Sequence, residues 1–468
     1  MIAPSLHPEP VSAACERRRR WGFGLTPRAI ALLIAGFAWL MPGFWKGWLA
    51  YAMVVWDGIV LAAAALDGMR LPRPSELIAG RRWLNALALD SETEIELTLE
   101  NRGRRIIECV MVDDLPPALA AQPETHRLTA FPRVPAVVRY RFEPRERGDW
   151  QAGWLFVRYR SPLGLVEGWA RAPLVQLVRV YPALRTGEEQ RIFLTRSRQI
   201  DLQLRQARQR GLGRDFESLR EYREGDDLRD VCWTATARRG SLISRQYQSE
   251  RSQAVWIVLD CGRLMQSRVG GAAVKTRMHS KLDHACMTAV ALAHLALFSG
   301  DRVGLLAYGA SIQQRLLPGR GASHMRQMIE MLAQARAESG EADHLLATAT
   351  LNRMQPRRSL ILWVTDLAET AMRPEVIDGA MQLARRHVLL FVAMAQPEVA
   401  RIAASRPRNV EEMYLSAAAQ EMADRRELLL ARLQEQGALT LDLAPETLTS
   451  SVLNRYLMVK ERAMVSGR

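Results

Sequence analysis

Two long apolar runs near the N-terminus constrain the fold of this chain more than any other feature. Residues 29–45 contain no charged side chain, and residues 47–66 contain only one, Asp57. A helix of about 20 residues crosses the hydrocarbon core of a bilayer, and about 17 residues lie near the lower limit. A Met-Pro-Gly turn at residues 41–43 would reverse the chain. The sequence therefore predicts a two-helix transmembrane hairpin over residues 29–68; a cleaved signal peptide, the alternative, would need only one shorter apolar stretch.

Basic residues flank the predicted hairpin on both sides. They are Arg17 to Arg20 and Arg28 before it, and Arg70, Arg73, Arg81 and Arg82 after it. Only Lys46 lies between the two runs. Because Lys and Arg are enriched in cytoplasmic loops, residues 1–28 are expected to form a basic cytoplasmic N-terminus, and the chain to return to the cytoplasm after the second span. Both termini are then cytoplasmic, and the protein resides in the cytoplasmic membrane.

Asp57 is the one acidic residue within the predicted hairpin. It falls near the middle of the second run, where a carboxylate is costly and is usually paired or functional. We expect it to be uncharged or hydrogen-bonded to a partner span in an oligomer, with a functional role as the alternative.

The charge balance leaves two kinds of partner open at first. Lys and Arg total 64 and Asp and Glu total 50, which gives a formal net charge of +14, and 48% of the residues are hydrophobic. This composition excludes a disordered chain, whereas the net charge suits either nucleic acid or an anionic membrane. In residues 186–252, however, basic and acidic residues are interleaved, and phosphate binding needs a one-sided patch. We therefore expect the lipid bilayer and other proteins as partners, and no nucleic acid.

Residues 83–185 show the alternation that is typical of half-buried β-strands. Polar and apolar side chains alternate over residues 94–100, and further strands are expected at 106–112, 137–142 and 154–159. Pro and Gly residues interrupt the pattern between these stretches. Short strands at such spacing predict a β-sandwich-like domain with a structural or binding role.

Residues 253–468 alternate apolar runs with helical patterns, which predicts a mostly parallel sheet covered on both faces in a Rossmann-type α/β domain. Two of the apolar runs end in a carboxylate, at Asp260 and at Asp366. Binding sites in such sheets lie beyond the carboxyl ends of the strands. The two aspartates are therefore the candidate site residues of this domain.

The charged segment of residues 186–252 carries the densest pattern in the chain. Its polar and aromatic residues are candidates for an ordered interaction surface: Arg220, Tyr222, Arg223, Asp226, Asp227, Trp233 and Arg238. The alternative is solvated structure held by salt bridges. Residues 219–227 (LREYREGDD) and 233–238 (WTATAR) closely resemble the signature of the proteins grouped as domain of unknown function 58.

That resemblance implies a bacterial protein with two N-terminal spans, a β-rich region and a C-terminal von Willebrand factor A-like domain. It also implies a partner, a MoxR-type AAA+ ATPase, to which the chain would be an accessory in the assembly or maturation of other proteins. The resemblance extends to residues 158–165 (RYRSPLGL), so it covers most of the chain. The localisation that it implies is the bacterial inner membrane.

A-type domains also imply a possible metal site. Their metal-ion-dependent adhesion site combines an Asp-x-Ser-x-Ser loop after the first strand with a later Thr and a later Asp. Asp260 and Asp366 match the two aspartates, but Gly262 and Leu264 replace the two serines, and no Thr is clearly placed. Mg²⁺ prefers octahedral oxygen ligation. Either the aspartates hold a metal at a degenerate site, or they are strand-end carboxylates capped by backbone N–H groups or by an arginine such as Arg263.

Catalytic patterns are sparse, so no catalytic residue and no cofactor are expected and the chain is predicted not to be an enzyme. It contains no Gly-x-Ser-x-Gly elbow and no His-Cys zinc spacing, and its five cysteines are expected to be reduced. The first hypothesis is a membrane-anchored cytoplasmic interaction or scaffold protein. The alternative is a metal-dependent ligand-binding protein or hydrolase that uses Asp260 and Asp366, with Mg²⁺ as the metal.

Overall fold

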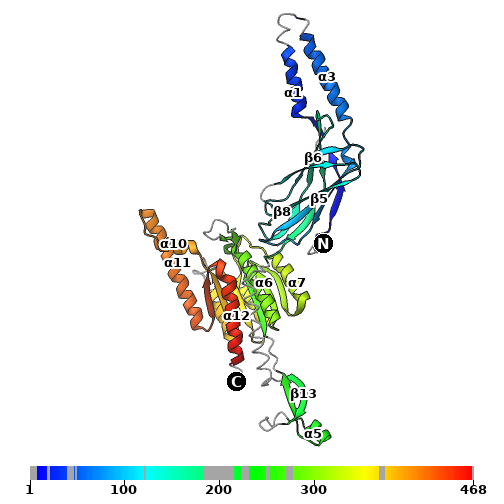
Figure 1. Ribbon diagram of the computed structural model, residues 1–468. Coiled ribbons are helices and arrows are strands. Elements are labelled where there is room, and N and C mark those ends of the chain that lie inside the picture. The colour runs from blue at the N-terminus through cyan, green and yellow to red at the C-terminus, as the bar shows by residue number, and fades with distance from the viewer. Residues whose placement is uncertain are drawn as a thin grey trace. The chain divides into compact units, whose positions relative to one another are not determined.

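The chain forms two compact units, Met1–Ala183 and Leu184–Arg468 (Figure 1). This computed structural model describes residues 8–17, 22–39, 47, 50–120, 123–183, 215–222, 231–248, 253–269, 278–367 and 375–465. The first unit is built from antiparallel strands and a pair of helices. The second holds a mostly parallel sheet between helices.

Two antiparallel sheets make up most of the first unit. The order in the first sheet is β1 (Val11–Ala14), β4 (Leu77–Trp83), β5 (Thr93–Asn101) and β8 (Pro135–Phe142). The order in the second sheet is β2 (Glu16–Arg17), β11 (Val166–Ala172), β10 (Leu155–Arg160), β6 (Ile107–Asp113) and β7 (Thr125–Ala130). In addition, β3 (Phe23–Leu25) pairs with β11, and β9 (Gly148–Ala152) pairs with β12 (Gln176–Val180). A 3-10 turn, η3 (Pro74–Glu76), precedes β4.

The alternating pattern of β5 explains how the two sheets pack. Ile95, Leu97 and Leu99 are buried, while the residues between them are half-buried on the other face. They belong to the same hydrophobic cluster as Met111 and Val157 of the second sheet. Because one core collects side chains from both sheets, the sheets are stacked face to face as a sandwich.

The sandwich takes in residues that the sequence pattern placed outside it. β1, β2 and β3 lie within residues 1–28, which were expected to form a separate basic N-terminus, and β4 begins before the expected domain start at residue 83. Val11 pairs with Arg81, and Leu25 pairs with Val166. These N-terminal strands contain at most four residues each, which is too few for alternation to be recognised.

Arg81, one of the arginines that flank the hairpin, is buried in this core. Its guanidinium pairs with the carboxylate of Asp113, and its Nη1 donates to the carbonyl of Leu174 at 2.9 Å. The hydroxyl of Tyr140 donates to the same carboxylate at 2.7 Å, and burial raises the pKa of Tyr140, so this hydroxyl keeps its proton. Arg81 therefore ties the two sheets together and does not contribute to the charge that faces a membrane.

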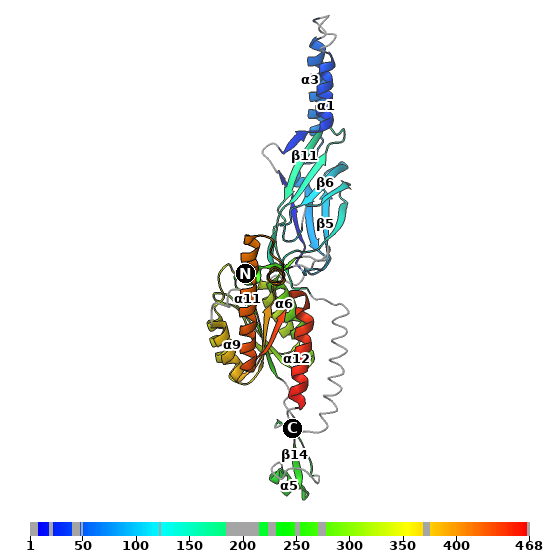
Figure 2. The ribbon, with the colours of Figure 1, turned by 90° about the vertical axis from the view of Figure 1, so that its left-hand side faces the viewer.

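Two helices separate β3 from β4 in the chain. α1 (Pro27–Gly36), followed by η1 (Phe37–Trp39), lies beside α3 (Ala50–Gly68) (Figures 1 and 2). α3 is long and apolar enough to cross a membrane, and α1 is a shorter apolar helix. The indole Nε1 of Trp56 donates to the carbonyl of Leu32 at 2.9 Å across the pair. The predicted hairpin is thus observed as a helix pair with one helix of spanning length.

Asp67, near the end of α3, binds a turn of the sandwich. This turn, Ser161–Leu165, connects β10 to β11. The buried carboxylate of Asp67 accepts hydrogen bonds from the hydroxyl of Ser161, from the backbone N–H of Leu163 at 3.1 Å and from that of Leu165 at 3.2 Å. The second helix is therefore fixed to the sandwich through hydrogen bonds that are shielded from water.

The same turn also holds the first helix. Thr26 is the N-cap of α1; its hydroxyl donates to the carbonyl of Gly164 at 2.5 Å, and its backbone N–H donates to the carbonyl of Leu165 at 3.0 Å. Below these bonds, Ala29 and Ala64 pack in a small apolar cluster with residues of the turn. One turn of the sandwich thus positions the bases of both helices.

Removing the Asp67 carboxylate tests this arrangement. Asp67→Ala leaves three donors without their acceptor, which is expected to lower the free energy of unfolding by about 3 kcal/mol. Chemical denaturation of the full-length protein in detergent would measure this loss. The matched control is Glu108→Ala, because Glu108 is exposed on β6 and its removal should cost less than about 0.5 kcal/mol. Equal effects of the two variants would contradict the structural role of Asp67.

A six-stranded sheet forms the centre of the second unit. Its order is β19 (Ile312–Gly319), β18 (Arg302–Tyr308), β15 (Ala254–Asp260), β20 (Leu360–Thr365), β21 (Val388–Met394) and β22 (Leu439–Leu443). All neighbours are parallel except β18 and β19, which form an antiparallel pair. Counted along the chain, this order is 3-2-1-4-5-6, that of a doubly wound Rossmann-type sheet. The predicted α/β class of this domain is confirmed.

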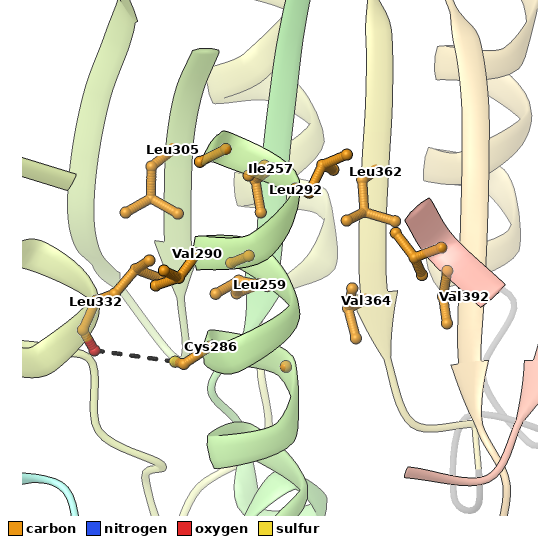
Figure 3. Packing of buried hydrophobic residues seen from close by; sticks show 14 of the residues in the cluster. Ile257, Leu259, Cys286, Val290, Leu292, Leu305, Leu332, Leu362, Val364 and Val392 are labelled. Atoms are coloured by element: carbon orange, nitrogen blue, oxygen red, sulfur yellow. Dashed lines mark hydrogen bonds between the residues drawn. The ribbon is translucent and has the colours of Figure 1, made fainter. Parts of the chain in front are cut away.

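Helices cover both faces of this sheet. They are α6 (Lys281–Phe298), α7 (Gly321–Gln334), α8 (His344–Met354), α9 (Glu375–Arg386), α11 (Val410–Glu435) and α12 (Leu448–Val465), while the short helix α10 (Pro397–Ala403) packs against α11. On one face, Leu292 of α6 and Leu332 of α7 pack with strand residues such as Leu259 (Figure 3). On the other face, helices α8, α9 and α11 pack over Trp363 and Phe391. The strands are buried on both sides, as their continuous apolar runs predicted.

Several short elements complete the second unit. They are β13 (Asp215–Glu221), α5 (Trp233–Arg239) and β14 (Ile243–Gln248), then η5 (Arg263–Gln266), β16 (Arg268–Val269), β17 (His279–Ser280) and η7 (Pro445–Thr447). β13 and β14 form an antiparallel pair. All five cysteines of the chain are free and buried, in agreement with the expectation of reduced thiols.

Candidate functional site at the carboxyl edge of the sheet

The strand order of the second unit fixes where its candidate site lies. In the 3-2-1-4-5-6 arrangement the order reverses between β15 and β20, and open α/β sheets bind their ligands beyond the carboxyl ends of the strands at such a switch point. Asp260 is the last residue of β15, and Asp366 follows the last residue of β20. The structure therefore brings the two predicted site residues to the same edge, where the charge of Asp366 acts on Asp260.

Both carboxylate oxygens of Asp260 accept hydrogen bonds. Oδ1 accepts from the backbone N–H of Gly262 at 2.7 Å, and Oδ2 accepts from the hydroxyl of Thr365 at 2.6 Å. The bond from Gly262 closes a short turn, in which the aspartate side chain accepts from the backbone two residues further on. The position that a serine would hold in an adhesion-site loop here contributes its backbone N–H instead.

Asp366 is surrounded by cationic and amide donors. Its Oδ2 forms a buried ion pair with Nζ of Lys281, and Nε2 of Gln396 donates to the same oxygen at 3.2 Å. A guanidinium nitrogen of Arg426 lies 3.6 Å from Oδ1. These donors come from the start of α6, from the N-cap of α10 and from the middle of α11. The carboxylate thus connects three elements that surround the switch point.

Lys281 is placed by the first turn of α6. Ser280 is the N-cap of that helix and forms a capping box with Asp283, in which the N–H of each residue donates to the side chain of the other at 3.2 and 3.0 Å. A cation at a helix N-terminus is repelled by the positive end of the helix dipole. Lys281 is only 2% exposed, so water cannot stabilise its charge. The buried carboxylate of Asp366 stabilises it instead.

Arg426 joins the long helix α11 to this edge. Its Nη2 and Nε bind the carboxylate of Asp442, at the end of β22, at 2.8 and 3.1 Å. The same guanidinium also faces Asp366. Arg426 therefore sits between two carboxylates, so its geometry is constrained from both sides.

The residues at this edge do not fit a magnesium ion. Such a site needs carboxylate and hydroxyl oxygens that are free to face the metal, whereas those of Asp260 already accept bonds from Gly262 and Thr365. Asp366 faces an ammonium and a guanidinium, which already supply the positive charge. Within the described residues, no group of three or more His, Cys, Asp or Glu side chains could hold a metal ion.

Burial changes the acidity of Asp260. It raises the pKa of this carboxyl from 3.8 to about 6, against the lowering effect of the bonds from Thr365 and Gly262, and the charge of Asp366 adds to the rise. The folded protein therefore holds this proton more tightly than the unfolded chain does. The resulting stabilisation is complete below about pH 4 and is lost as the pH rises through about 6.

This shift predicts a pH-dependent difference between the wild type and Asp260→Asn. A change of two pKa units corresponds to about 3 kcal/mol, so the free energy of unfolding of the wild type should fall by up to that amount relative to the variant between about pH 4 and pH 7. Denaturant titrations at a series of pH values measure it. Asp424→Asn, at an exposed position of α11, is the control and should follow the wild-type profile. Parallel profiles for Asp260→Asn and the wild type would contradict the raised pKa.

The structure places part of the predicted interaction surface. Arg220 lies in β13, Trp233 begins α5, and Arg238 lies in the last turn of that helix. The N–H of Tyr222 donates to the carbonyl of Leu242 at 2.8 Å, which extends the pairing of β13 with β14. Arg223, Asp226 and Asp227 lie outside the described residues.

Trp233 is the clearest surface feature of this segment. Trp233 is 67% exposed, although the two residues before it, Val231 and Cys232, are buried. The N–H of Cys232 donates to the carbonyl of Ile243 at 2.8 Å, and the hydroxyl of Thr236 accepts from the N–H of Ile243 at 3.0 Å. These bonds fix α5 against β14, so the exposed indole is presented by an anchored helix.

Asp57 lies within the helix pair. Its Oδ1 is buried and has no hydrogen-bond partner among the described residues. A Cβ atom at Gly36 of α1 would come within 2.5 Å of this oxygen, so a larger residue there would displace the Asp57 carboxylate. Whether Asp57 pairs with a second copy of the chain stays a prediction.

The sequence pattern missed four residues of the edge: Lys281, Thr365, Gln396 and Arg426. Thr365 directly precedes Asp366 at the end of the apolar run, and its hydroxyl donates to Asp260. The other three lie on separate elements that are brought together only by the tertiary fold. Lys281 carried one usable signal, since a lysine after a Ser N-cap opposes the helix dipole.

Comparison with known proteins relates part of the chain to a family. Residues 218–413 match the family described as "Protein of unknown function DUF58", which confirms the resemblance for this segment. Uncharacterized proteins of Mycobacterium tuberculosis and Mycobacterium bovis are 27% identical to the chain over 191 residues. The match covers 40% of this chain and 56% of the relatives, so the chain spans little more than half of their length.

Solved structures give weaker likenesses. The conserved hypothetical protein BatB from Bacteroides thetaiotaomicron is 15% identical, covers 46% of this chain and all of its own, and has a TM-score of 0.28. The SpRpn10 VWA domain is 13% identical, covers 42% of this chain and 89% of its own, and has a TM-score of 0.24. An uncharacterized membrane spanning protein from Vibrio fischeri is 17% identical, covers 30% of this chain and 71% of its own, and scores 0.17. These scores are too low to carry an argument about fold or function. The fold is assigned from the strand order of the chain itself.

Proposed function

We propose that the protein is a membrane-anchored interaction protein, in which the helix pair is the anchor and the second unit binds protein partners. The observation that carries the proposal is the exposed Trp233, held on an anchored helix within the segment that matches the family. Interaction hot spots are enriched in Trp, Tyr and Arg, and α5 carries both Trp233 and Arg238 at exposed positions. Binding, not catalysis, is the activity proposed for this unit.

The membrane anchor is supported by the topology of the first unit. β3 before α1 and β4 after α3 belong to the same sandwich, so both ends of the helix pair lie on the same side of any membrane that it enters. Large apolar side chains are exposed along the pair, among them Ile34, Val54 and Ile59. Exposed apolar surface of this kind suits a lipid environment. We propose two spans with cytoplasmic termini, in the inner membrane of a bacterium.

The proposed partner is a MoxR-type AAA+ ATPase, with the chain acting as its accessory in the assembly or maturation of other proteins. The family resemblance supports this choice of partner, and the mixed charges of the signature segment suit a protein contact better than nucleic acid. The anchor would then hold the ATPase or its client close to the membrane.

The membrane topology can be tested with engineered cysteines. The native thiols are buried, and burial raises the pKa of Cys15 and Cys109 to about 12, so they should not react. Gly47→Cys, between the helices, is expected to react with a membrane-impermeant maleimide in cells with a permeabilised outer membrane. Arg104→Cys, exposed on the sandwich, should react only after lysis. Labelling of Arg104→Cys in unlysed cells would contradict the proposed orientation.

The partner surface can be tested by affinity capture of the full-length protein from detergent extract. Trp233→Ala is expected to lower the recovery of the AAA+ ATPase at least about tenfold, because hot-spot residues supply most of the binding energy. Leu317→Ala is the matched control, since Leu317 is an exposed apolar residue on β19 and should leave recovery unchanged. Wild-type protein that captures no AAA+ ATPase would contradict the proposed partner, and equal recovery with both variants would contradict the proposed surface.

A further inference from the structure

The carboxyl edge of the sheet holds an ion pair at the place where an A-type domain would bind a divalent cation. The two aspartates that match the adhesion site, Asp260 and Asp366, both lie there and are buried. Of the two, Asp366 carries the direct contact with a cation, the ammonium of Lys281. That ammonium is itself buried, so it is a fixed part of the interior and not a surface charge.

Two buried carboxylates at one edge repel each other unless a positive charge lies between or beside them. A divalent cation is one solution, and a buried lysine is another. In this chain Lys281 supplies the charge, Arg426 adds a second cation 3.6 Å from the other oxygen of Asp366, and Gln396 donates to the same carboxylate. The loop after β15 matches this arrangement, because Gly262 replaces a hydroxyl ligand and gives its N–H to Asp260.

We infer that Lys281 is a built-in replacement for the metal, so that this edge of the domain is complete without a divalent cation. The inference concerns the site itself and does not rest on the proposed partner. It has two consequences. The wild-type protein neither binds nor needs a divalent ion. Removal of the lysine charge leaves the buried Asp366 carboxylate without the ammonium it pairs with, so that a divalent ion can take the place of that ammonium.

The chain offers a matched control in Lys460. Its ammonium is also buried, lies 2.9 Å from the carboxylate of Asp301 and donates to the carbonyl of Ser299 at 2.8 Å. The Asp301 carboxylate also accepts from the hydroxyl of Tyr456 at 2.5 Å. Lys460→Met therefore removes a buried lysine and leaves a buried carboxylate, but at a place that the fold does not match to an adhesion site.

The experiment compares wild type, Lys281→Met and Lys460→Met as full-length proteins in detergent. Mn²⁺ alone is the probe, its uptake is measured by equilibrium dialysis, and thermal unfolding is followed with Mn²⁺ or with EDTA. We expect the wild type to take up no Mn²⁺ at millimolar concentration and to unfold at the same temperature in both conditions. Lys281→Met should unfold at a lower temperature than the wild type in EDTA. It should take up Mn²⁺ and regain thermal stability with it. Lys460→Met should also unfold earlier but gain nothing from Mn²⁺.

A double variant, Lys281→Met with Asp366→Asn, covers the case in which the single variant does not fold in EDTA. It removes both charges, and we expect it to fold without metal and to take up no Mn²⁺. Uptake of Mn²⁺ by the wild type would overturn the inference, and so would a folded Lys281→Met that takes up none. Failure of both the single variant in Mn²⁺ and the double variant to fold would overturn it as well, because the loss would then come from the packing of the lysine stem and not from its charge.

Discussion

Asp67 places a carboxylate among the donors of the turn at residues 161–165, away from water. A buried acceptor of this kind is costly unless each oxygen is satisfied, and here a hydroxyl and two backbone N–H groups satisfy it. Since Thr26 binds the same turn, the direction in which both helices leave the sandwich depends on these few bonds. The pairing of the two helices depends on that common attachment, because helices that left the sandwich at different places could not pair.

Buried carboxylates recur as connecting points in this protein. Asp113 ties the two sheets of the sandwich through Arg81, and Asp366 joins three elements at the sheet edge through Lys281, Gln396 and Arg426. In each case the acid sits at or near the end of a strand or helix, where the backbone pattern changes. Removal of one partner from such a pair leaves an uncompensated buried group, which costs more than the pair itself contributes. These connections therefore define geometry more than they add stability.

The sequence predicted the elements whose pattern is long, and it failed where the pattern was short or three-dimensional. The apolar runs of the α/β domain and the alternation of β5 were visible because they extend over many residues. β1, β2 and β3 were not predicted, since strands of two to four residues are too short to show a period. Arg81 was assigned to the membrane flank because its burial depends on a partner on another sheet.

The residues of the candidate site also differ in whether the sequence could predict them. Asp260 and Asp366 could be found because a carboxylate after an apolar run falls at the edge of a parallel sheet. Lys281 and Arg426 could not, because α6 and α11 are far apart in the chain and only the fold brings their charges to one carboxylate. Thr365 shows a third reason, since it is adjacent to a predicted residue but its hydroxyl binds Asp260 on the neighbouring strand.

The helix pair is inserted in the chain between two strands of the sandwich, β3 and β4, and this order has a consequence for biosynthesis. β3 leaves the ribosome before α1, but its partner β11 follows α3, and Leu25 must wait for Val166 before it can pair. Domains generally fold during synthesis only when all their strands are available. The helices therefore emerge while the sandwich is still incomplete, and the turn that holds their bases forms only after both helices have been made.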